Sequence, residues 1–326
     1  MKRSPYYYAG ICVMTAVSGL ALSHCGAKEA VVDTTSPAAF VASAAKGDAA
    51  TMNRFFKAGM SPDTRDSTGN SPLIAAASAG QLEIVQLLLT KGANPNMAKP
   101  EDGWTPLLAA AQAGHTNIIE ALVTKGADVN AATPDRFTPL MAAAQKGGEQ
   151  ALRSLIGHGA TVNTTNKDGW SALMAAAESN KPGTVAALLD GGADVKTALP
   201  EGWTPMMAAS KVGNVASVTA LIDAGADVNA HNKDGWTALM AAPEGGSSDV
   251  VNALLAHRAD VNAASNDGWT PLMAAADKGR AEIARVLLDK GAKITAANHQ
   301  NRTALTYAER GKHDDVVALL KKSGAK

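Results

Sequence analysis

The stretch DGWSALMAAA, residues 168–177, decides the fold of this chain because it returns almost unchanged further along the sequence. Close copies are DGWTALMAA at residues 234–242 and DGWTPLMAAA at residues 267–276. Looser copies start at Ser71, Thr105, Thr138, Thr204 and Thr303. From Thr105 onward the opening Ser or Thr recurs every 33 residues, and the step from Ser71 to Thr105 is 34. A fixed period of this size is typical of a protein built from stacked repeats.

Each copy predicts a first helix. The opening Ser or Thr hydroxyl can cap that helix, and a Pro at the first helical position has no N–H to leave unsatisfied. Alanine runs such as residues 75–77 favour a helix and let it approach its neighbour closely. A column of glycines predicts where these helices end: Gly47, Gly80, Gly114, Gly147, Gly213, Gly246 and Gly279. Asn180 replaces the glycine in one copy, and Asn is the usual substitute where a left-handed residue ends a helix.

A second helix follows in each copy. Its apolar residues, such as Ile84, Val85 and Leu88, are spaced to lie on one buried face. A second column of glycines predicts its end: Gly59, Gly92, Gly126, Gly159, Gly192, Gly225, Gly291 and Gly324. Arg258 interrupts that column. Next comes Ala-Asp-Val-Asn or a relative of it, and then a turn such as NKDG at residues 232–235.

Thr-Pro-Leu-x-Ala-Ala, the two helices, Gly-Ala-Asp-Val-Asn and the Asp-Gly turn together resemble the ankyrin repeat over residues 36–326. The resemblance implies an all-α solenoid of eight or nine stacked units with β-hairpin-like loops, capped around Gly47 and Lys312. Ankyrin repeats often have a His after Thr-Pro-Leu that links neighbouring repeats. This chain has Ile74, Leu108, Met141, Met174, Met207, Met240, Met273 and Thr306 there. We expect these residues to fill the same space between repeats, since Met adapts to irregular gaps.

The seventh unit departs from the pattern at two positions. Pro243, followed by Glu-Gly-Gly, predicts a shortened first helix. Arg258 stands where the other units prefer Gly, and a positive φ there costs on the order of 1 kcal/mol. We therefore expect a local soft spot in this unit.

The start of the chain predicts export. Lys2 and Arg3 precede an uncharged run from Ser4 to Ser23, which indicates a signal peptide over residues 1–24 and a tether over residues 25–35. Leu-x-x-Cys ending at Cys25 resembles the bacterial lipoprotein box, although His24 replaces its usual small residue. That resemblance implies lipidation of Cys25 and anchoring to the outer membrane from the periplasm. Two other interpretations stay open: cleavage after Ala27 to give a soluble periplasmic protein, or a short membrane anchor.

The composition argues against nucleic-acid binding and catalysis. Without Lys2 and Arg3, 28 of the 30 basic residues remain against 30 acidic ones, a net charge of −2 with no basic stripe. No nucleophile motif or phosphate-binding Gly loop is present. The histidines after the signal are scattered across different repeats, without the i, i+4 spacing of a helical zinc pair. We predict a protein that is not an enzyme, with no cofactor and no metal site.

One feature of the repeats stands out, because the residue just before the opening Ser or Thr is aromatic in six successive units. These residues are Trp104, Phe137, Trp170, Trp203, Trp236 and Trp269. The flanking units have Asn70 and Arg302 there. The ankyrin resemblance implies that the position lies near the hairpin tip, on the concave side. Two interpretations stay open: the rings hold the hairpins in register, or they form an exposed strip that binds a partner.

We favour binding, and the sequence therefore predicts a monomeric, non-catalytic module that grips a protein partner along this aromatic strip in the bacterial envelope. Exported relatives suggest inhibition or protection of an envelope enzyme as one role. Two alternatives remain: a structural scaffold whose strip pairs with a second copy, and a binder of cell-wall glycan, since Trp faces also stack on sugar rings.

Overall fold

The computed structural model describes residues 33–325. The predicted signal peptide over residues 1–24, Cys25 and most of the tether lie outside the described residues. The chain divides into two units, Met1–Asp33 and Thr34–Lys326, and every helix described here belongs to the second.

The described part of the chain is a series of helix pairs, which we number as repeat units 1 to 9. The first helices are α1 (Pro37–Lys46), α3 (Pro72–Ala79), α5 (Pro106–Ala113), α7 (Pro139–Lys146), α9 (Ala172–Glu178), α11 (Pro205–Val212), α13 (Ala238–Gly245), α15 (Pro271–Asp277) and α17 (Ala304–Gly311). The second helices are α2 (Ala49–Lys57), α4 (Leu82–Thr90), α6 (Thr116–Thr124), α8 (Glu149–Gly157), α10 (Pro182–Asp190), α12 (Val215–Asp223), α14 (Ser248–Ala256), α16 (Ala281–Asp289) and α18 (Asp314–Lys322). Between residues 33 and 325, β-structure is limited to isolated bridges such as His231 with Thr237. The predicted all-α repeat solenoid is confirmed.

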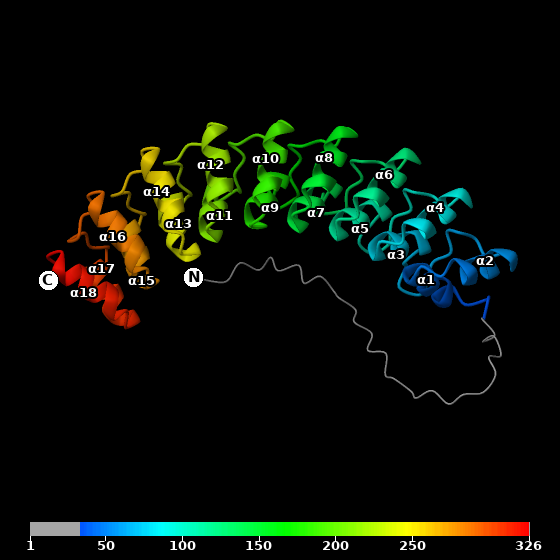
Figure 1. The fold of residues 1–326 in the computed structure, drawn as a ribbon, viewed down its shortest axis with the longest axis horizontal. Helices are drawn as coiled ribbons and strands as arrows, with labels where there is room; N and C mark the ends of the chain where they lie inside the picture. Colours follow the sequence, from blue (N-terminus) through cyan, green and yellow to red (C-terminus); the bar gives the residue numbers. More distant parts are fainter. Residues whose placement is uncertain (1–32, 326) are drawn as a thin grey trace, which may run out of the picture. The chain divides into compact units, whose positions relative to one another are not determined.

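The helices lie in two rows, with first helices packing on first helices and second helices on second helices (Figure 1). Within this array the first helices line the inner side of the curve (Figure 1). The residues that replace the usual His are buried between units, with Leu108, Met174 and Met207 fully covered, whereas Thr306 in the last unit is exposed. The prediction that apolar side chains fill this space is confirmed for the internal units.

The local signals for helix ends are also confirmed. The Ser or Thr side chain accepts a hydrogen bond from the backbone N–H three residues on at the start of most first helices, for example Met174 N–H to Ser171. Thr237 is an exception, with no such bond. Both glycine columns adopt positive φ, and so do Asn180 (φ 55°) and Arg258 (φ 66°) in their places. Arg258 therefore carries the backbone strain that the sequence predicts.

The prediction of a shortened helix at Pro243 is wrong. Helix α13 runs over eight residues to Gly245, the same length as α11, and Pro243 is buried inside it. One proline removes one internal hydrogen bond. The rest of the helix is held by close packing on α11, where the backbones of Gly213 and Gly245 meet.

An asparagine ladder joins successive units on the side of the second helices. The Nδ2 of Asn96 donates to the carbonyl of Gly126 over 2.9 Å, and its Oδ1 accepts from the N–H of Asp128 over 2.7 Å. The same pair of bonds recurs at Asn130, Asn163, Asn229 and Asn262. Lys196 occupies this position in unit 5, and no side chain in the described residues makes the bridge at the joint to unit 6. The ladder therefore has a gap between units 5 and 6.

Candidate functional site

Each aromatic residue of the strip closes a hairpin just before a first helix. The carbonyl of Trp170 accepts from the N–H of Asn166 over 2.9 Å, and the N–H of Trp170 donates back to the Asn166 side chain over 2.8 Å. Asn232 holds Trp236 in the same way. Except at Thr237, the next residue also caps the helix, so these bonds and the cap fix the backbone position from which each ring projects. All six rings are half-buried.

Neighbouring hairpins are joined in one of two ways. In the first, the N–H of one hairpin donates to the carbonyl of the previous one, as from Lys233 to Glu201 over 2.8 Å. The same bond joins Lys167 to Asp135, Asn266 to Asp234 and His299 to Asp267. In the second, a proline ring packs on the glycine of the previous hairpin: Pro100 on Gly69, Pro134 on Gly103 and Pro200 on Gly169. These contacts align the hairpins, and with them the aromatic strip.

The six rings do not form one continuous stack. Trp104 and Phe137 are stacked with centroids 6.2 Å apart, as are Trp236 and Trp269. Among the described residues, neither Trp170 nor Trp203 contacts another aromatic ring. The two ends of the strip therefore have the stacking that a framework role requires, whereas its middle does not.

Tyr307 ends the strip and was not among the residues predicted from the sequence. It occupies a position that holds Ala in the internal units, and its ring meets Trp269 edge-on with centroids 4.4 Å apart. Its hydroxyl bonds Asn298 over 2.9 Å. Trp269 is thus held between Trp236 and Tyr307, and its indole N–H is buried without an acceptor. The signal in the sequence was an aromatic residue interrupting a column of alanines.

A row of carboxylates runs beside the aromatic strip, two residues before each ring. Its members are Asp102, Asp135, Asp168, Glu201, Asp234 and Asp267, all exposed. The flanking units have Thr68 and Gln300 there. From the sequence, Asp-Gly was predicted only to form a turn. The shared 33-residue period of the acids and the rings was the signal that could have identified this row.

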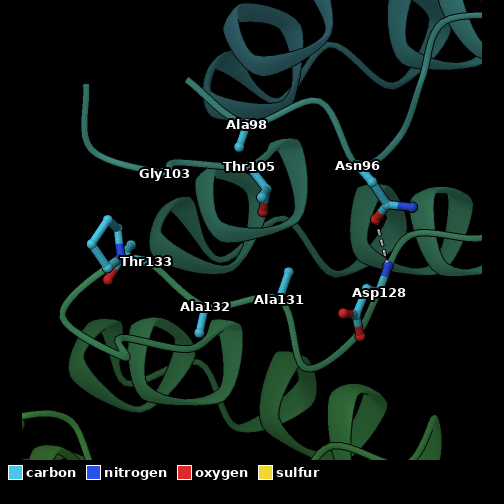
Figure 2. A pocket seen from close by; sticks show the side chains of 9 residues that line it. Asn96, Ala98, Gly103, Thr105, Asp128, Ala131, Ala132 and Thr133 are labelled. Atoms are coloured by element: carbon cyan, nitrogen blue, oxygen red, sulfur yellow. Dashed lines mark hydrogen bonds between the residues drawn. The ribbon is translucent and has the colours of Figure 1, made fainter. Parts of the chain in front are cut away.

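A hollow lies between the hairpin loops of units 3 and 4 (Figure 2). It measures about 600 Å³ and is lined mainly by short side chains, including Ala98, Thr105 and Ala132. Figure 2 shows Asn96 reaching the backbone N–H of Asp128 at one side, which is one rung of the asparagine ladder. Asp128 is its one ionisable lining residue, so the hollow presents no acid–base pair.

Several ionisable side chains of the repeats pair with one another at the surface. Glu120 accepts hydrogen bonds from Ser154 and from His158, and these bonds hold the pKa of its carboxyl below the usual value. Arg153 pairs with Glu149 on its own helix, α8, and with Asp190 on the neighbouring second helix, α10. Within residues 33–325 no group of three or more His, Cys, Asp or Glu residues could hold a metal ion.

The chain was compared with known proteins. The family described as ankyrin repeats (3 copies) matches residues 39–133, 132–198, 183–265, 206–298 and 260–326, which together cover most of the sequence. No curated protein matches the chain significantly. Among the described helices, none has the length and apolar character needed to cross a membrane. Ankyrin repeats generally mediate protein–protein interaction. The chain belongs to the ankyrin-repeat family.

Proposed function

We propose that this protein is a binding module that holds a protein partner along the aromatic strip of units 3 to 8. The observation that carries the proposal is that six successive units present a half-buried aromatic ring at the same point of the hairpin. Interface centres are enriched in such rings, and Trp is prominent among the residues that dominate binding energy. The module acts by occupying or shielding its partner.

The middle of the strip is the part best suited to contact a partner. Trp170 and Trp203 retain exposed ring surface and have no aromatic neighbour, whereas Trp104 and Trp269 are engaged by other rings. A ring that no other ring covers contributes less to the register of the hairpins. Its removal therefore separates a binding role from a framework role better than removal of a stacked ring.

Replacing Trp170 and Trp203 with alanine is expected to lower partner capture at least about tenfold while the solenoid stays folded, because Trp contacts at interface centres are worth about 2 kcal/mol or more. The measurement is crosslinking and pull-down from native cell envelopes, after circular dichroism and melting show that both proteins are folded.

Leu89→Ala/Ile222→Ala is the matched control, since it removes half-buried apolar side chains from second helices α4 and α12. It should capture the same partner as the unchanged protein. Equal capture by the Trp variant would refute the strip as the site. A dimer in light scattering that the Trp variant dissociates would instead assign the strip to self-association.

We also propose that the module is exported and held at the periplasmic face of the outer membrane by lipid on Cys25, where an envelope enzyme that it inhibits or protects is one candidate partner. The support is the basic start, apolar run and Leu-x-x-Cys pattern of the sequence. Cys25→Ser is expected to move the protein from the membrane fraction to the soluble fraction, because the anchoring chain is lost. Labelling with an alkyne fatty acid checks the modification itself, and labelling that persists in Cys25→Ser would contradict the assignment.

A further inference from the structure

The carboxylates beside the aromatic strip are not neutralised by cations to the same extent along the solenoid. In units 3 and 4 the acids have their own cations: Lys99 lies 3.8 Å from Asp102, and Lys167 lies 3.4 Å from Asp135. In units 5 to 8, Asp168, Glu201, Asp234 and Asp267 form no ion pair within the described residues. Four successive unpaired carboxylates therefore stand beside the rings of these units, and their charge is available to a ligand.

Two aromatic rings near this row already have a cation of the protein itself over one face. The Lys211 ammonium lies 6.0 Å from the centre of the Trp203 ring. The Arg310 guanidinium lies 4.9 Å from the centre of the Tyr307 ring. Both distances suit a cation–π contact. Lys211 is exposed, and its counterparts in units 5 and 7 are Glu178 and Glu244, so the neighbouring Trp170 and Trp236 have no such cation.

Two lysines near the row do not cancel its charge. Lys167 points its ammonium to Asp135 in the previous unit. Lys233 is exposed beside Asp234 and makes no ion pair with it within the described residues. The arrangement that remains is a series of half-buried aromatic rings, each with a carboxylate two residues earlier in the chain, which matches a side chain with an aliphatic stem and a cationic end.

We propose that units 5 to 8 bind an extended, lysine- or arginine-rich segment of a protein partner. The aliphatic stems lie against the exposed surface of the four half-buried Trp rings, and the cationic ends meet the four unpaired carboxylates. The inference rests on the proposed function and specifies its partner. Packed helices lie about 8–10 Å apart, and an extended segment in the polyproline II conformation advances about 3.1 Å per residue and returns to the same face every third residue. Basic residues at every third position of the segment would therefore meet successive repeat units, one residue to each unit.

The test uses the full chain and a labelled twelve-residue peptide with Arg at every third position and Ser and Thr between. Its binding is followed by fluorescence anisotropy. We expect saturable binding that weakens as salt is added, because the carboxylates are exposed. A peptide of the same composition with its four Arg residues in one block should bind about tenfold more weakly, and a peptide with Glu at the four positions should not bind.

The decisive variant is Asp168→Asn/Glu201→Gln/Asp234→Asn/Asp267→Asn, which removes the charges and keeps the rings. It should bind the Arg peptide about 30-fold more weakly, since each of the four exposed pairs contributes about two- to threefold to the affinity. The matched control is Glu83→Gln/Asp223→Asn/Asp249→Asn/Asp289→Asn, which changes the net charge equally at exposed positions of the second helices. It should bind as the unchanged protein does.

The outcomes separate this inference from the proposed function. Failure of the unchanged protein to bind the Arg peptide, or equal binding by the two fourfold variants, overturns the basic segment. If the envelope partner is then still captured by the unchanged protein and lost with Trp170→Ala/Trp203→Ala, the strip binds a partner of different chemistry. If the unchanged protein does not bind the Arg peptide, and the Trp variant captures the partner as well as the unchanged protein does, both proposals are refuted.

Discussion

Gly245→Ala is expected to destabilise the solenoid by about 3 kcal/mol, at the upper end of the cost of overpacking. A Cβ on Gly245 would lie 2.5 Å from the backbone nitrogen and 2.7 Å from the Cα of Gly213 in the preceding unit. Both atoms belong to the backbone, so no flexible side chain can move aside. Helices α11 and α13 must separate to admit the methyl group, and closely packed interiors resist such separation.

Gly157→Ala provides the control, because Gly157 is also the last residue of its helix and a Cβ there would meet no atom within 4 Å. That change should stabilise α8 by up to about 1 kcal/mol through helix propensity. Urea unfolding measures both effects. Hydrogen exchange should localise the Gly245 effect to units 6 and 7, since each unit of a solenoid contacts only its neighbours. Equal stability of the two variants would contradict the close approach.

Much of the fold could be predicted from the sequence because its determinants are local and repeat with one period. The capping Ser171, the left-handed Asn180 and the strained Arg258 each act within a few residues of the chain. The family and the helix pairs follow from such signals. The length of α13 did not follow, because its continuation past Pro243 depends on contact with another unit.

Contacts between units limited the prediction of the candidate site in the same way. The sequence identified the six aromatic positions, yet stacking differs among them because ring orientation depends on the neighbouring hairpin. Trp269 is held by Tyr307 from the next unit, whereas Trp203 has only Lys211 over its face. The carboxylate row was visible in the sequence, but whether Asp135 or Asp168 has a cation partner is a property of the structure.

Unit 6 contains a group of polar side chains that leaves buried atoms unsatisfied. The hydroxyls of Ser210 and Ser217 and the Nδ2 of Asn214 are buried without hydrogen-bond partners. Most other units have Ala or an aliphatic residue at the two serine positions, such as Ala276 and Ile283 in unit 8, and the hydroxyl of Thr184 in unit 5 bonds the carbonyl of Lys181. The asparagine ladder is also interrupted at Lys196, just before this unit. The weakest joints should therefore flank unit 6, and not be confined to the strained seventh unit.

Ser210→Ala/Ser217→Ala is expected to stabilise the protein by about 2 kcal/mol, because each buried hydroxyl without a partner costs about 1–3 kcal/mol and alanine adds no bulk. Urea unfolding gives the free energy, and hydrogen exchange should show slower opening of units 5 to 7.

The converse variant, Ala276→Ser/Ala151→Ser, introduces hydroxyls at the same two repeat positions in units 8 and 4, where the native alanines are fully or almost fully buried. It should lose about as much free energy of unfolding as the first variant gains.

If the first variant gains nothing while the second loses stability, the two native hydroxyls have found partners, and the softness of unit 6 then follows from the gap at Lys196 alone. A gain in the first and a loss in the second would mean that the strength of each joint depends on how its buried positions are filled. The same helix pair would then be firm at one place in the solenoid and yielding at another, and the yielding joints would flank the unit that contains Trp203.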